Sequence, residues 1–166
     1  MIEHISPQHA DAPDFTTQKN DRREVFGWMM YDWANSAFYT TVVGALYGPY
    51  LTRLTQVAVG DDGTALRLGP LLSIPAKSFF PLCVMLAVGL QIFLLPVLGA
   101  IADYSKLKKR LMACFCYAGA TATCLMFFVT GDRYLLGGLL FIIAIVGFNA
   151  AIVFYNSYLP QITTED

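Results

Sequence analysis

Polar side chains recur on one face of the first long apolar segment, inside the stretch YDWANSAFYT (residues 31–40). Positions i, i+3, i+4 and i+7 share a stripe on an α-helix, and the residues at that spacing are Asp32, Asn35, Ser36 and Tyr39. A carboxylate, an amide and hydroxyls at this spacing can hold a cation, exchange a proton or hydrogen-bond a polar solute. Whether such chemistry is costly depends on whether the helix lies in water or in lipid.

The distribution of charge indicates lipid. Charged residues make up 14% of the chain, whereas soluble domains carry about 25%. Residues 79–102, 111–131 and 134–164 contain no charge, and residues 25–52 contain only Asp32. Each run has at least the roughly 20 residues that cross a hydrocarbon core. The sequence therefore predicts an all-α, polytopic membrane protein with four transmembrane helices.

The predicted organisation has three parts. A polar tail covers residues 1–24, the membrane region covers 25–160, and a short, apparently truncated end covers 161–166. Helices are expected near 25–52, 79–102, 111–129 and 134–159, with a Gly- and Pro-punctuated outer loop at 60–78.

Basic residues set the expected orientation, because Lys and Arg next to the spans favour the cytoplasmic side. The larger set lies before the first helix and between the second and third: Lys19, Arg22, Arg23, Lys106, Lys108, Lys109 and Arg110. The smaller set is Arg53, Arg67, Lys77 and Arg133. Both termini are therefore expected in the cytoplasm.

Inside a bilayer, Asp32 requires an explanation. A charged residue near the middle of a span costs about 2.5–3.5 kcal/mol on insertion scales, so such residues usually face protein or water. One hypothesis is a hydrogen-bonded anchor for neighbouring helices, and the other is a position facing a watery cavity. A second stripe of the same helix consists of small residues, which favour close helix packing in membranes: Ala34, Ala37, Thr41, Gly44 and Gly48.

Two asparagines, Asn149 and Asn156, lie seven residues apart in the fourth predicted helix and share a face. They fit helix packing and solute contact about equally well. In the second helix, Pro96 cannot donate to the carbonyl of Ile92 and should bend the helix there.

Several kinds of site have little support. The four cysteines lie in apolar runs without the spacing of a zinc site, and they are expected to be buried. Both histidines, His4 and His9, lie in the tail, and no nucleotide-binding loop is present. Asp61 and Asp62 lack the further ligands of a calcium loop. The net charge of −1 gives no reason to expect nucleic acid. No cofactor and no enzyme activity are therefore expected.

Between the second and third helices, GAIADYSKLKKRLM (residues 99–112) resembles the cytoplasmic loop motif of the major facilitator superfamily. The residues that fit are Gly99, Ala102, Asp103, Lys108, Lys109 and Arg110. The usual second glycine is absent, and Tyr104 replaces the common arginine. In addition, GWMMYDWANSAFYTTV and VFYNSYLP resemble helices one and four of the vacuole-effluxer-like branch, which includes the autophagy-related vacuolar amino-acid effluxer.

This resemblance, over about residues 24–160, implies secondary transport of a small solute by alternating access, for which amino acids are a candidate class. One hypothesis for Asp32 is that it carries a coupling proton, and the other is that it binds a cationic part of the solute. It implies that Asp32, Asn35, Tyr39, Asn149 and Asn156 face the transport path. The membrane would be the cell membrane or, in a eukaryote, the vacuolar membrane. Superfamily members have about twelve helices in two halves, so the chain is expected to be an N-terminal piece whose partner half is missing.

Other hypotheses remain open at this stage. One is a small four-helix membrane protein with a structural or assembly role. Another is a homo-oligomeric four-helix exporter that uses Asp32 as its coupling acid. Further hydrophobic spans downstream in the gene would favour the transporter.

Overall fold

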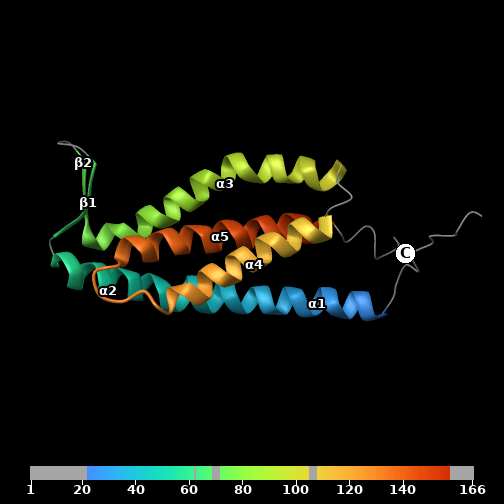
Figure 1. Cartoon of the computed structure of the whole chain (residues 1–166), viewed down its shortest axis with the longest axis horizontal. Helices are drawn as coiled ribbons and strands as arrows, with labels where there is room; N and C mark the ends of the chain where they lie inside the picture. The colour runs from blue at the N-terminus through green and yellow to red at the C-terminus, as the bar shows by residue number, and fades with distance from the viewer. Residues whose placement is uncertain (1–21, 62, 69–71, 105–107, 158–166) are drawn as a thin grey trace, which may run out of the picture.

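The computed structural model describes residues 22–61, 63–68, 72–104 and 108–157. Its elements are α1 (Arg22–Ala37), η1 (Phe38–Leu46), α2 (Tyr47–Val59), β1 (Thr64–Leu68), β2 (Leu72–Pro75), η2 (Ala76–Ser78), α3 (Phe79–Tyr104), α4 (Lys108–Met126) and α5 (Tyr134–Asn156). The segments α1, η1 and α2 follow one another without a break and form the first helix. The four long helices lie side by side along one axis (Figure 1). We call the end that carries the hairpin the outer end, and the opposite end, where α1 and α4 begin, the inner end.

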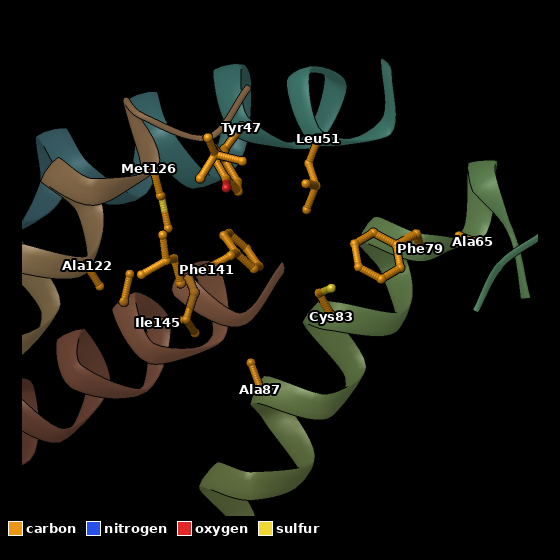
Figure 2. Packing of buried hydrophobic residues seen from close by; sticks show 13 residues of the cluster. Tyr47, Leu51, Ala65, Phe79, Cys83, Ala87, Ala122, Met126, Phe141 and Ile145 are labelled. Atoms are coloured by element: carbon orange, nitrogen blue, oxygen red, sulfur yellow. The ribbon is translucent and has the colours of Figure 1, made fainter. Parts of the chain in front are cut away.

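The outer end has the larger core. Buried side chains from α2, α3, α5 and the last turns of α4 meet there, as Figure 2 shows for Tyr47, Leu51, Phe79 and Phe141. The aromatic rings of Tyr47 and Phe141 stack at 5.4 Å. A smaller cluster at the inner end joins Leu98 and Ala102 of α3 to Ala150 and Phe154 of α5. The helices are therefore held by two separate groups of apolar contacts.

Close packing of α4 on α5 depends on two glycines. A Cβ added at Gly147 would lie 3.0 Å from the carbonyl oxygen of Phe115 and 3.1 Å from the Cα of Gly119. Because neither neighbour is a flexible side chain, any larger residue at Gly147 forces the two helices apart. Gly119 of α4 is therefore a small residue that α5 contacts directly.

The segment 60–78 differs from the predicted outer loop. Its strands β1 and β2 form an antiparallel hairpin in which Leu66 pairs with Ile74 and Arg67 with Ser73. The hydroxyl of Tyr134, at the start of α5, donates to the carbonyl of Ala65 at 3.1 Å. In the hairpin, backbone N–H and C=O groups pair with each other, whereas in a loose loop they would have to bind water. A hairpin is therefore favourable here.

The first helix also differs from a regular α-helix, because η1 is a nine-residue π-helix. At its end the N–H of Tyr47 donates to the carbonyl of Val42, five residues earlier. Pro49 explains the wider turn, since a proline has no N–H and its ring clashes with the carbonyl four residues before it. The run Thr40–Val43 adds β-branched side chains, which fit a regular helix less well.

Among the described helices, two are long and apolar enough to cross a membrane by length and composition: the helical segment Ala76–Ala102 and α5. The first helix and α4 carry charged residues, such as Arg22, Asp32 and Arg110, that lower their mean hydropathy. Pro96 lies inside α3, and α3 changes direction part-way along (Figure 1). This bend agrees with the one predicted from Pro96.

Candidate functional site

An apolar groove lies between the inner half of the first helix and the pair α4–α5. Its volume is about 280 Å³. One wall is formed by Tyr31, Asn35 and Phe38, and the others come from α4 and α5: Cys116, Gly119, Ala120, Thr123, Cys124, Ala144, Phe148 and Ala151. We call this space the inner groove. Asn35 and Thr123 give it a few hydrogen-bonding groups in mostly apolar surroundings.

The structure divides the predicted polar stripe. Asn35 is half-buried and lines the inner groove, whereas Asp32 and Ser36 are exposed and do not. Tyr39 is also exposed, with its ring 5.7 Å from that of Phe148 on α5. Because successive residues on a helix differ by about 100°, Asp32 is turned away from the groove that the adjacent Tyr31 lines. The four residues therefore do not form one continuous surface.

Asp32 has no hydrogen bond or ion pair with any side chain that the structure describes. Its neighbours on the same polar stripe, Asn35 and Ser36, do not provide one. Its carboxylate lies close enough to Tyr155 to act on that hydroxyl electrostatically. Within the described part of the chain, Asp32 is thus an exposed acid on α1, next to an aromatic side chain of α5.

That aromatic side chain belongs to a cluster that links α1 to α5. The rings of Trp28 and Tyr155 stack at 4.7 Å with 9° between their planes, and Tyr31 lies 4.9 Å from Tyr155. The hydroxyl of Tyr155 donates to the backbone carbonyl of Trp28 at 3.0 Å. Trp28 was not among the residues predicted from the sequence to be functional. Trp28, Tyr31 and Asn35 recur at helical spacing in the sequence, but spacing alone does not tell which neighbour that face will meet.

The two predicted asparagines have different surroundings. The Nδ2 of Asn149 donates to the Oε1 of Gln91 on α3 at 2.8 Å. Gln91 is only 9% exposed, and its Nε2 has no hydrogen-bond partner among the described residues. Asn156 is exposed. Of the two alternatives for Asn149, helix packing therefore gains direct support from a contact within the chain.

The predicted packing face of the first helix is wrong for most of its length. Ala34, Ala37, Thr41 and Gly44 are exposed, and a Cβ added at Gly44 would meet only the helix's own Tyr39 carbonyl. Gly48 alone behaves as expected, since its Cβ would lie 2.9 Å from the ring of Phe80. Spacing identifies residues that share a face, but over α1 the neighbouring helices of this chain contact a different face, which carries Trp28 and Tyr31.

The loop motif lies at the inner end of the bundle. Gly99 is half-buried, and a Cβ added there would meet no described atom within 4 Å, so this glycine is not required for a close helix contact. Lys108 is half-buried, whereas Lys109 and Arg110 are exposed at the start of α4. The side chain of Asp103 lies outside the described residues. The basic part of the motif is therefore located, and the acidic part is not.

The cysteines correct another expectation. Only Cys83 is buried, while Cys116 is half-buried in the inner groove and Cys114 and Cys124 are exposed. They were expected inside the protein because they lie in apolar runs, but a helix in lipid places apolar side chains on its outer surface as well. The described part of the chain contains no group of three or more His, Cys, Asp or Glu side chains able to hold a metal ion.

Comparison with known proteins identifies the family. The family described as "Vacuole effluxer Atg22 like" matches residues 20–166. The MFS-type transporter YxiO of Bacillus subtilis is 28% identical over 151 residues, which cover 91% of this chain and 31% of YxiO. Autophagy-related protein 22-1 of Penicillium rubens is 30% identical over 189 residues, covering 93% of this chain and 31% of the relative.

Autophagy-related protein 22 of Coccidioides immitis is 26% identical over 185 residues, and these cover 93% of this chain and 31% of that protein. This chain thus spans about a third of the length of these relatives. No solved structure matches it. Because the family match extends over all of the residues that the structure describes, the chain belongs to the Atg22-like vacuole effluxer family, whose matched relatives include an MFS-type transporter.

Proposed function

We propose that this chain forms the N-terminal part of a secondary-active transporter that moves a small solute across a membrane by alternating access. The observation that carries this proposal is the family match over residues 20–166. Since the chain spans 31% of relatives such as YxiO, we propose that the second wall of the solute path is supplied by a further part of the transporter.

The proposed arrangement has four transmembrane helices with both termini in the cytoplasm. Arg22, Arg23, Lys108, Lys109 and Arg110 support this orientation. They lie at the inner end of the bundle, where α1 and α4 begin, and such basic residues favour the cytoplasmic face. The apolar side chains exposed along α3, such as Met85, Ile92 and Phe93, would then contact lipid or the remaining helices.

We propose that the solute path runs along the face of the first helix that carries Asp32 and Tyr39, and along Asn156 of α5. Asp32 supports this because an unpaired carboxylate in a span is stable only where water or an ion can reach it. In this role Asp32 either exchanges the coupling proton or binds a cationic group of the solute. Amino acids, the substrate class that the resemblance implies, carry such a group.

The test is transport into proteoliposomes by the polypeptide as its gene encodes it, with a mixture of radiolabelled amino acids and an imposed proton gradient. We expect accumulation by the parent protein and its loss in Asp32→Asn, which keeps the side-chain shape and removes the charge. Asp61→Asn, in the exposed turn after α2, is the matched control and should transport normally.

Full gradient-driven accumulation by Asp32→Asn contradicts the role of Asp32. If the parent protein accumulates none of the labelled amino acids, the proposed substrate class is wrong. Loss of folded Asp32→Asn protein, measured by size-exclusion chromatography in detergent, would instead support a structural anchor at this position.

A further inference from the structure

The two halves of the first helix differ in how firmly the rest of the chain holds them. In α2, Tyr47, Gly48, Leu51 and Thr55 are buried, and the hydroxyl of Tyr47 donates to the carbonyl of Gly137 on α5 at 3.0 Å. In contrast, no described side chain of α1 or η1 is buried. The outer half is therefore part of the core, and the inner half lies against its surface.

The boundary between these halves is η1. A π-helix of nine residues is unusual, because π-turns occur mostly as single-turn bulges and often at functional sites. Pro49 removes a hydrogen bond that would hold the helix straight, and the hydroxyl of Thr40 donates to the carbonyl of Ser36 at 2.8 Å. A helix weakened in this way bends more easily here than elsewhere along its length.

In the described part of the chain, the contacts between α1 and α5 centre on Tyr155. They include the Trp28–Tyr155 stack, the contact of Tyr31 with Tyr155, and the hydrogen bond from the Tyr155 hydroxyl to the Trp28 carbonyl. Between these contacts and η1 lies the inner groove of about 280 Å³, with Tyr31, Asn35 and Phe38 facing α4 and α5 across it. The space needed for α1 to move inward is therefore present.

We propose that η1 is a hinge on which α1 swings against α4 and α5, opening and closing the inner groove while α2 stays fixed in the outer core. The contacts of Tyr155 with Trp28 and Tyr31 stabilise one of the two positions of α1, the one seen in this structure. Since Asp32 lies on the swinging segment, the movement would also change its surroundings. The proposal concerns motion within this chain and holds for any solute.

The expected displacement of the inner end of α1 follows from its distance along the helix from η1. Phe26 precedes η1 by twelve residues, which corresponds to about 18 Å along a helix. A bend of about 20°, typical of a distinct kink, moves Phe26 by roughly 6 Å relative to α4. A displacement of this size is measurable between two spin labels.

The test uses double electron–electron resonance on the chain in lipid bilayers. All native cysteines are replaced by alanine, except that Cys114 is kept in the inner pair. The inner pair joins a label at Phe26→Cys, exposed on α1, to a label on the exposed native Cys114 of α4. The outer pair, which is the matched control, joins labels at Val57→Cys of α2 and Leu125→Cys of α4, both exposed.

We expect the distance distribution of the inner pair to be broader than that of the outer pair by roughly 6 Å. Pro49→Ala restores a backbone donor, so it should narrow the inner distribution and leave the outer one unchanged. An inner distribution as narrow as the outer one in the parent protein overturns the hinge, even if Pro49→Ala fails to fold. Because the readout is a distance, a negative transport result leaves this test unaffected.

Discussion

At the scale of single residues, the polar groups of this chain fall into two kinds. Asn149 is satisfied by Gln91 within the protein, whereas Asp32 is exposed without a hydrogen-bond partner in the described part of the chain. A polar group that has a partner contributes to stability, and one that lacks a partner in a membrane indicates water or a ligand. This distinction separates the structural amide from the candidate functional acid, which the sequence pattern alone did not do.

The amide pair gives a prediction for stability. Asn149→Leu removes the only partner of the Gln91 amide that the structure describes, so it should lower the free energy of unfolding by about 1 kcal/mol. Adding Gln91→Leu removes the stranded group and should recover most of the loss, because replacing both partners by apolar groups is nearly neutral. Unfolding in detergent, followed by tryptophan fluorescence, measures both variants. A double variant that is less stable than Asn149→Leu would contradict this prediction. It would show that Gln91 contributes to stability beyond its hydrogen bond with Asn149.

At the scale of elements, the long uncharged runs were enough to predict helices around 79–102 and 134–159, because length and apolarity describe such helices well. The hairpin was missed although its signal was present: Leu66, Arg67 and Leu68 alternate in polarity, as do Leu72, Ser73 and Ile74. The π-helix was not predicted, because a proline such as Pro49 indicates a disturbed helix but does not specify a wider turn. The face of the first helix that contacts α5 was not predictable, since spacing cannot tell which neighbour a face will meet.

The corrected packing face leads to a second prediction. Gly48→Leu should reduce the amount of folded protein, because its side chain would overlap the ring of Phe80, 2.9 Å from the added Cβ. Gly44→Leu, on the same stripe but exposed, is the matched control and should fold nearly as well as the parent. Fluorescence size-exclusion chromatography of fusion proteins compares the two yields. Equal losses in both variants would restore the original prediction that the whole stripe packs on another helix.

At the scale of the whole molecule, the chain is a helical bundle with a firm outer end and a looser inner end. The outer core joins α2, α3, α4 and α5, whereas α1 is attached to α5 by ring contacts and one hydrogen bond of Tyr155. Many large apolar side chains stay exposed, including Phe93, Tyr117 and Phe127. A surface of this kind fits lipid and further transporter helices, in agreement with the membership of the Atg22-like family.

The most direct test of the central proposal asks whether Asp32 faces water inside the membrane. Asp32→Cys and Tyr117→Cys are compared in a cysteine-free chain in lipid vesicles, with a charged methanethiosulfonate reagent on both sides. The two positions lie at similar depth, about 15 Å from the inner end of their helices, and Tyr117 is 73% exposed on α4. We predict that Asp32→Cys reacts at least about tenfold faster, because a charged reagent is excluded from lipid. Equal rates, or a slower reaction at Asp32→Cys, would contradict a watery path along the first helix.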